Sequence, residues 1–334
     1  MPGIPVVLLF GATASGKTEV LEKLWADSGT LPPAIEIISA DSMQIYRGMD
    51  IGTAKPPPEL LHRLPHHLID IRSPQEPFCA GDFVREADLC CQDIRRRGRI
   101  PVLCGGTGFY LRNFLLGLPD TPQPGPETRR RLQERLEREG ADALFRELAQ
   151  VDPARAAQLH PRDVYRVLRA LEIYQDSGAV QSAFSLPSAP RSGYRFLTLS
   201  LDRPRDDLYR RIEARCAGMF RQGLEEEVSG LIRAGCRAGD PGMRAIGYRE
   251  FFSVPGAAEK LAAGKPLSAE ERALVQEAVV RDSKRYAKRQ ETYMKALPGV
   301  IHINAGENPA ERIGQLFADF TAEGNPPGND TAEK

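Results

Sequence analysis

The sequence predicts an α/β protein whose phosphate-binding loop (P-loop) core is a parallel sheet flanked by helices, with an inserted helical domain. Short apolar runs alternate with helical patterns up to residue 120, as expected for a parallel sheet. The first run, Val6–Phe10, leads into Gly11–Thr18, which matches strand–GxxxxGK[ST]–helix. A proline-rich stretch at 119–126 then opens a charged helical region, and a strand pattern returns only at 195–201.

The elements can be assigned in chain order from hydrophobic periodicity. Expected strands are 6–10, 35–38, 67–71, 100–104, 195–201 and 300–303. Expected helices are 17–26, 80–97, 127–139, 142–150, 163–177, 205–218, 224–234, 268–295 and 309–322. We therefore predict a discontinuous core of 1–120 and 193–323, a helical insertion at 121–192 and a disordered tail at 324–334.

Composition bounds the function only loosely. The chain has 334 residues, and its 45 basic residues balance 45 acidic ones, so net charge does not indicate a nucleic-acid partner. Its six cysteines lack metal-binding spacing and predict reduced thiols in a cytoplasmic protein. No apolar run is long enough to span a bilayer, so no membrane partner is expected.

The P-loop predicts a polyphosphate ligand. Its residues are Gly11, Ala12, Thr13, Ala14, Ser15, Gly16, Lys17 and Thr18. The glycines allow successive N–H groups to curl around an anion, and the helix that follows adds its positive dipole end. Lys17 would contact the terminal phosphate, and the Thr18 hydroxyl would be a ligand for Mg²⁺. A chance Gly-rich turn is disfavoured because strand, loop and helix patterns agree.

The ends of two other strands indicate which chemistry to expect. Many P-loop kinases and nucleotide hydrolases have a strand that ends in a metal-binding Asp, whereas 100–104 runs into Gly105-Gly106-Thr107. Asp41 instead follows the strand pattern at 35–38 and is a candidate general base, with a turn or helix cap as the alternative. Thr107 is a candidate phosphate ligand or a helix cap.

Basic residues are concentrated locally rather than overall. Arg166 and Arg169 share a helix face, Arg244 and Arg249 flank Gly247-Tyr248, and Arg211 and Arg215 lie one turn apart. The helix at 268–295 carries Arg281, Lys284, Arg285, Lys288, Arg289 and Lys295, with Tyr286 and Tyr293 between them. Cations interleaved with aromatic rings are typical of RNA-binding surfaces, but solvated helix faces give the same pattern.

Taken together, these motifs resemble the bacterial tRNA dimethylallyltransferases (tRNA isopentenyltransferases, the IPP transferase family). The resemblance covers the chain from Gly11 to about Lys295, and the combination is far more specific than a P-loop alone. Two positions differ from many members: Ala12 replaces Pro, and Tyr293 replaces Trp. The segments that carry it are GATASGKT at 11–18, SADSMQIYRGMDIGTAKP at 39–56, GRIPVLCGGTGFYLR at 98–112, HPRDVYRVLRALEIY at 160–174, GMRAIGYRE at 242–250 and YAKRQETYMK at 286–295.

The resemblance implies transfer of a dimethylallyl group from dimethylallyl diphosphate to N6 of the adenosine 3′ to the tRNA anticodon (adenosine 37). It implies that Asp41 takes the N6 proton, Thr107 positions the diphosphate and Arg215 stabilises the leaving group. Gly11–Thr18 would hold the diphosphate and Mg²⁺, and a monomer is expected. The implied contacts with tRNA are Asp41, Ser42, Met43, Gln44, Thr107, Arg129, Tyr165, Arg166, Val167, Leu168, Arg169, Arg244, Ala245, Ile246, Gly247, Tyr248, Arg249, Lys288, Arg289, Gln290, Glu291, Thr292, Tyr293, Met294 and Lys295.

Two other functions are compatible with the same P-loop. One is a small-molecule kinase that uses ATP, for which Lys17 and Thr18 would have the same positions. The other is a non-enzymatic RNA-binding protein that uses a nucleotide as a switch.

Overall fold

The computed structural model describes residues 3–26 and 34–322 of the chain. These residues form two compact units. The first comprises the chain up to Leu115 and from Arg191 onward, and the second is Leu116–Pro190. The predicted insertion at 121–192 falls almost wholly in the second unit, and the predicted tail at 324–334 lies outside the described residues.

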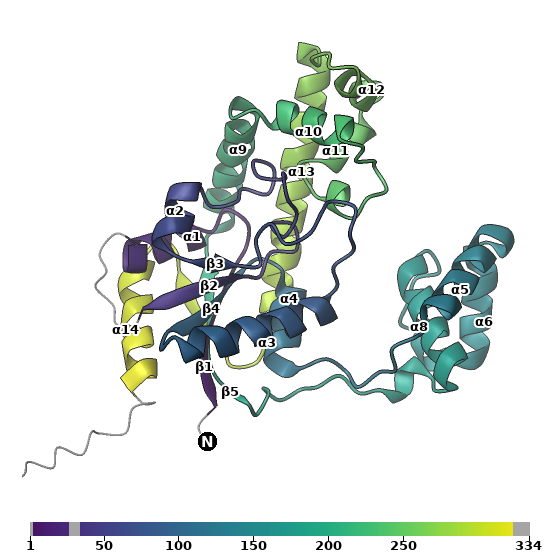
Figure 1. The fold of residues 1–334 in the computed structure, drawn as a ribbon, viewed down its shortest axis with the longest axis horizontal. Helices are drawn as coiled ribbons and strands as arrows, with labels where there is room; N and C mark the ends of the chain where they lie inside the picture. The colour runs from purple at the N-terminus through teal and green to yellow at the C-terminus, as the bar shows by residue number, and fades with distance from the viewer. Residues whose placement is uncertain (1–2, 27–33, 323–334) are drawn as a thin grey trace, which may run out of the picture. The chain divides into compact units, whose positions relative to one another are not determined.

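A six-stranded parallel sheet organises the first unit (Figure 1) and confirms the predicted α/β class. The strand order is β3-β2-β4-β1-β5-β6, which places the strand before the P-loop in the middle of the sheet. The strands are β1 (Ile4–Gly11), β2 (Ile35–Ser39), β3 (His66–His67), β4 (Ile100–Gly105), β5 (Tyr194–Asp202) and β6 (Ile301–Asn304).

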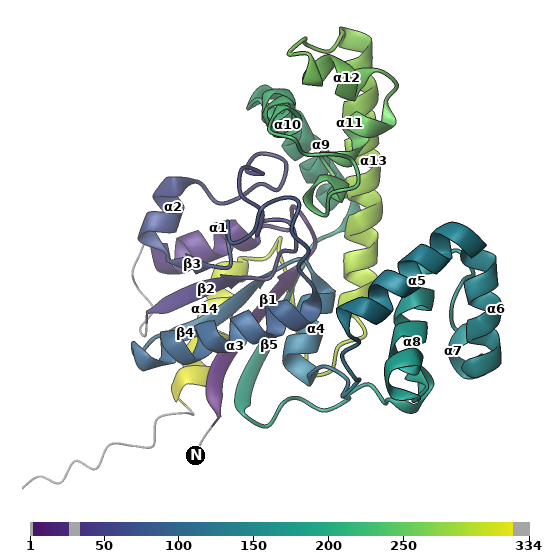
Figure 2. The same ribbon diagram turned by 45° about the vertical axis from the view of Figure 1, so that its right-hand side comes forward.

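Helices of the first unit cover both faces of this sheet (Figure 2). Val7 and Leu9 point to one face and share a buried apolar cluster with Leu21 and Phe317. The helix α3 lies on the other face, against β1, β2 and β4. The helices are α1 (Lys17–Leu21), α2 (Pro58–Arg63), α3 (Ala80–Arg96), α4 (Gly108–Leu116), α9 (Arg205–Arg221), α10 (Leu224–Arg233), α11 (Arg249–Ser253), α12 (Ala257–Ala262), α13 (Ala269–Met294) and α14 (Pro309–Ala322).

A second apolar core joins the helices α9 to α13 to the loop that follows β2. In it, Ile45 and Met49 of that loop are buried in the same cluster as Leu208, Tyr248 and Val275. Figure 2 shows these helices grouped on one side of the sheet, with the long α13 running from the group back toward the sheet. The loop after β2 therefore lies between the sheet and these helices.

The predicted strand at 67–71 is wrong beyond His67, because β3 is His66–His67. Pairing with β2 stops at His67 because the next residues leave the extended conformation, with φ of +62° at Leu68 and +56° at Asp70. The Asp70 backbone N–H donates to Gln44 O (3.2 Å), and its carboxylate pairs with Lys55. Contacts with the loop after β2 thus replace strand pairing here.

The second unit is a small helical bundle with its own core. Its helices are α5 (Pro126–Glu139), α6 (Ala141–Val151), α7 (Pro153–Ala156) and α8 (Val164–Ser177). Leu132, Leu144, Leu148 and Leu171 meet at its centre and are almost fully buried. Many of its arginines pair with carboxylates, such as Arg135 with Glu139 and Glu147, so the charged pattern of the sequence is partly a network of surface ion pairs.

Candidate active site

The P-loop leaves β1 at Gly11 and enters α1 at Lys17. Gly16 has φ +105°, a left-handed conformation that glycine adopts without strain. Gly11 also has to be glycine, since a Cβ there would lie 2.4 Å from Ser15 Oγ. The Ser15 hydroxyl is buried and has no hydrogen-bond partner among the described residues. The Ser15 hydroxyl is therefore a buried donor that the loop leaves unsatisfied.

Lys17 folds over this loop. Its Nζ donates to Gly11 O (2.8 Å) and Ala12 O (3.0 Å), and burial lowers the pKa of Lys17. Two arginines hold the loop from outside: Arg203, between β5 and α9, donates to Ser15 O (3.2 Å), and Arg211 of α9 donates to Ala14 O (2.9 Å). Arg211 also pairs with Glu19, so it supports the loop rather than forming a free solvated face.

A pocket opens beside the P-loop at the carboxyl ends of β2 and β4, the usual place for ligands in parallel sheets. It brings together Lys17 and Thr18 of the loop, Asp41, and Arg215 of α9, four residues that are predicted for the site from separate parts of the sequence. Burial lowers the pKa of Arg215, and the Asp41 carboxylate opposes that shift. Leu21, Ile37, Leu60 and Leu64 add apolar side chains to a lining that is otherwise largely polar.

Asp41 and Thr107 belong to one hydrogen-bonded network. Thr107 Oγ1 accepts from Ser42 N (3.0 Å) and lies 3.3 Å from Ser42 Oγ. Asp41 Oδ1 accepts from Met43 N (2.9 Å), the turn geometry that an Asp at this place favours. The backbone segments at Ala40 and Gly105 approach closely because residue 105 is glycine. A Cβ at this position would lie 2.2 Å from Ala40 O. Thr107 itself does not line the pocket and instead fixes the loop that carries Asp41.

Two residues of α13 that were not predicted for the pocket also line it. Gln290 bridges the two glycine-rich loops, because its Oε1 accepts from Thr13 N (2.9 Å) and its Nε2 donates to Gly106 O (2.7 Å). Tyr286 lies one turn earlier, and burial raises its pKa to about 12. Ala287, Gln290 and Met294 are all buried at a spacing of three and four, and this periodicity in the sequence could have placed Gln290 inside.

The loop after β2 closes the pocket on its remaining side. Gln44 Oε1 accepts from Ser39 Oγ (2.9 Å), and its Nε2 donates to Ala54 O (3.2 Å). Thr53, Ala54 and Pro56 line the pocket together with Gln44. The side chains of Ser42 and Met43 are half-buried next to them. Of the residues at 41–44, Ser42 and Gln44 thus bond to other segments, Asp41 bonds to Met43 within the loop, and Asp41 and Gln44 line the pocket itself.

The remaining residues expected to contact tRNA differ in exposure. Exposed side chains belong to Arg129, Tyr165 and Arg166 in the second unit and to Arg244, Lys288, Arg289, Thr292 and Lys295 in the first. Partly exposed residues are Leu168, Arg169, Ile246, Arg249, Glu291 and Tyr293. Buried residues are Val167, Ala245, Gly247, Tyr248, Gln290 and Met294. The buried group packs within its own unit, so the exposed cations are the stronger candidates for RNA contact.

Two negative observations apply to residues 3–26 and 34–322. Within these ranges no helix is long and apolar enough to cross a membrane. The same ranges hold no group of three or more His, Cys, Asp or Glu side chains placed to hold a metal ion.

Comparison with known proteins agrees with this architecture. The family model of IPP transferases matches residues 44–297. A tRNA dimethylallyltransferase of Geobacter sulfurreducens is 44% identical over 304 residues, which cover 91% of this chain and 93% of the relative. A second relative, tRNA dimethylallyltransferase 2 of Geotalea uraniireducens, is 43% identical, with 87% and 89% covered.

Solved structures extend the likeness to the fold. The tRNA isopentenylpyrophosphate transferase of Bacillus halodurans has a TM-score of 0.64 at 33% identity, with 96% of this chain and 97% of that chain covered. A eukaryotic dimethylallyltransferase crystallised while acting on tRNA has a TM-score of 0.74 at 23% identity and supports the fold alone, with 98% and 81% covered. This chain belongs to the IPP transferase family.

Proposed function

We propose that this protein transfers the dimethylallyl group of dimethylallyl diphosphate to N6 of adenosine 37 in tRNA. The observation that carries the proposal is the composition of the pocket. Lys17 and Thr18 of the P-loop, the cation Arg215, the carboxylate Asp41 and the side chains of Leu21, Leu60 and Leu64 all line the same space. A short apolar group attached to a diphosphate matches this combination of cationic and apolar groups better than a nucleoside triphosphate does.

The reaction uses two sets of groups that line the pocket. The N6 lone pair forms a bond to C1 of the dimethylallyl group, the C1–O bond breaks, and its electron pair leaves with diphosphate. Asp41, a carboxylate at the strand end, accepts the proton that N6 loses. Lys17, Arg215 and the P-loop N–H groups stabilise the charge that collects on the diphosphate.

We propose Mg²⁺ as the cofactor, held by the Thr18 hydroxyl and the diphosphate. The donors present fit this ion, because Mg²⁺ is usually bound by few protein oxygens plus substrate phosphates and water. Thr18 is exposed on the pocket, and Asp41 is the carboxylate that lines the same space. When bound, the ion supplies additional positive charge to the leaving diphosphate.

The substrate tRNA would approach the exposed cations Lys288 and Arg289 of α13 and Lys295 just after it, and another face of this helix carries Gln290 into the pocket. The target base would be flipped from its stack to reach Asp41. We propose that the protein acts as a monomer, and a tRNA substrate supports a cytoplasmic location.

The test is incubation with labelled dimethylallyl diphosphate, Mg²⁺ and unmodified tRNA, with and without ATP. We expect label on tRNA without ATP and, after digestion to nucleosides, on a single modified adenosine. ATP turnover with no label on tRNA would instead support a small-molecule kinase. Binding of tRNA with neither reaction would support an RNA-binding protein.

A further inference from the structure

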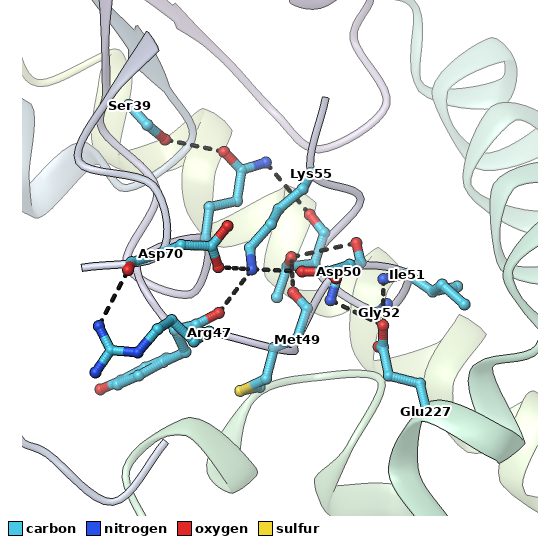
Figure 3. Close-up of polar contacts among 12 residues, drawn as sticks. Ser39, Arg47, Met49, Asp50, Ile51, Gly52, Lys55, Asp70 and Glu227 are labelled. Carbon is cyan, nitrogen blue, oxygen red and sulfur yellow. Dashed lines mark hydrogen bonds and ion pairs between the residues drawn. The ribbon is translucent and has the colours of Figure 1, made fainter. Parts of the chain in front are cut away.

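The loop Met49–Lys55 is held from outside by a carboxylate of α10. Glu227 Oε2 accepts from Asp50 N (2.8 Å) and Ile51 N (2.7 Å), and its Oε1 accepts from Gly52 N (3.1 Å). Figure 3 shows Glu227 facing these three consecutive residues. Three N–H groups that converge on one carboxylate form a charge-assisted clamp, which is stronger than bonds between neutral groups.

Tyr248 completes this clamp from the segment before α11. Its hydroxyl donates to Glu227 Oε1 (2.7 Å), and its ring is fully buried against Gly52. A Cβ at Gly52 would lie 2.5 Å from Tyr248 Cε2, so the ring and the loop fit only because residue 52 is glycine. Burial, reinforced by the Glu227 charge, raises the pKa of Tyr248, which keeps the hydroxyl a donor.

The inner side of the same loop is fixed by Lys55. Its Nζ donates to Tyr46 O (2.7 Å) and pairs with Asp50 (2.6 Å) and with Asp70 (Figure 3). The ammonium group therefore joins the two ends of the loop. Outside and inside contacts meet at Asp50, whose N–H is held by Glu227 and whose carboxylate is held by Lys55.

The residues next to the clamp form the wall of the pocket. Thr53 follows Gly52 directly, its Oγ1 donates to Met49 O (2.5 Å), and it lines the pocket with Ala54. Thr53 O and Ala54 O both face the Gln44 amide, which lines the pocket too. The clamp is thus one residue away from the surface that a bound donor would contact.

We propose that Glu227 and Tyr248 are positioning residues, which fix Thr53 and Ala54 as the pocket wall against which the allylic diphosphate binds. They touch no reacting atom and act through the backbone of Asp50, Ile51 and Gly52. The identity of the ligand rests on the proposed function, whereas the clamp itself does not. The motifs YRGMDIGTAKP and GMRAIGYRE are far apart in sequence but meet where the Tyr248 ring packs against Gly52.

The variants are Glu227→Gln, Glu227→Ala and Tyr248→Phe. Glu227→Gln keeps the volume of the side chain but directs an NH₂ donor at N–H groups, so it separates acceptor chemistry from packing. The matched control is Glu225→Gln on the same helix. Glu225 is buried and accepts from Leu267 N (2.8 Å) and Arg272 Nε (2.8 Å), so its loss disturbs α10 without touching the loop.

Two readouts are measured on the full chain. The first is amide hydrogen exchange of residues 50–52, which needs no substrate, and we expect exchange about 10- to 100-fold faster in both Glu227 variants. The second is transfer kinetics at saturating tRNA. There we expect KM for dimethylallyl diphosphate to rise about tenfold with kcat within about twofold, the pattern of lost donor binding rather than lost folded protein. Tyr248→Phe should give a smaller change of the same kind.

The outcomes separate the two proposals. Unchanged exchange in Glu227→Gln, or faster exchange with unchanged KM, would overturn the positioning role. A rise in KM that Glu225→Gln shares would overturn it as well, because the effect would then be a general one of α10. If the unmodified protein transfers no label, the proposed function fails, and affinity for dimethylallyl diphosphate measured by calorimetry replaces KM. If Glu227→Ala does not fold, the results for Glu227→Gln and Tyr248→Phe decide whether Glu227 and Tyr248 are positioning residues.

Discussion

Gln290 Oε1 accepts a hydrogen bond of 2.9 Å from the backbone N–H of Thr13, in the middle of the P-loop. The other end of the same amide donates to Gly106 O at 2.7 Å. A Cβ on Gly106 would lie 2.2 Å from Gln290 Nε2, so the second loop has no room for a side chain here. One buried side chain of α13 therefore sets the spacing between the two glycine-rich loops.

Replacement of Gln290 by Ala should weaken donor binding. It leaves Thr13 N and Gly106 O without their partner, at a cost of about 1–3 kcal/mol, and we expect KM for dimethylallyl diphosphate to rise about tenfold. Gln315→Ala is the control, because Gln315 is exposed on α14 and bonds only Asp319 in the described contacts. The measurement is KM for dimethylallyl diphosphate, determined by steady-state kinetics for both variants. Equal KM values would show that the bridge has no effect on the pocket.

Loss of the Thr107 hydroxyl should slow transfer while the protein stays folded. The hydroxyl holds Ser42, the neighbour of Asp41, and its removal lets the carboxylate move from its place at the pocket. We expect Thr107→Ala to reduce kcat about tenfold, since one neutral hydrogen bond contributes about 1 kcal/mol. Thr107→Ser keeps the hydroxyl and should retain most activity. A Thr107→Ala rate equal to that of the unmodified protein would reduce Thr107 to a helix cap.

Neutralising two exposed cations of α13 should weaken tRNA binding. In the double variant Lys288→Ala, Arg289→Ala we expect a lower affinity and a slope of log K against log[salt] that is less steep by about 1.5–2, because two phosphate contacts are lost. The double variant Arg95→Ala, Arg96→Ala removes the same charge from the exposed end of α3. Filter binding across a salt series measures the tRNA affinity and the salt slope of both double variants. The same slope in both variants would mean that Lys288 and Arg289 form only a solvated face.

Acid should destabilise the sheet through Glu36 of β2. Burial raises the pKa of Glu36, but hydrogen bonds from Arg97 and His67 outweigh it and lower the pKa to about 2. A lowered pKa gives stability that is complete above the unfolded value, near 4.5, and is lost as pH falls toward 2. The loss is on the order of 3 kcal/mol. Glu36→Gln should flatten the free energy of unfolding across this range, and an unchanged pH dependence would contradict this role.

Most of the sheet could be predicted from the sequence because its strands are nearly continuous apolar runs, such as Val6–Phe10. The strand at 67–71 was predicted wrongly because its alternation is local, whereas Asp70 is held by Lys55, distant in sequence. Short helices such as α2 and α11 were not predicted, since one or two turns leave little periodicity.

The residues of the candidate site also fall into those that the sequence predicts and those that it does not. Lys17 is predicted from the P-loop motif. Asp41 is predicted from its place after a strand, because the carboxyl ends of parallel strands meet at one edge of the sheet. Glu227 was not found, because an acidic residue in the first turn of a helix is ordinary and its partners are backbone groups of a loop far away in the chain.

The most direct test of the account is the single-turnover rate of dimethylallyl transfer to tRNA by the unmodified protein and by Asp41→Asn, with tRNA affinity measured in parallel. The substitution removes the proton acceptor and changes little else, so we expect the rate to fall about 10²- to 10⁴-fold while tRNA affinity changes by less than about threefold. A normal rate in Asp41→Asn would remove Asp41 from the role of base. Absence of transfer by the unmodified protein would contradict the account itself.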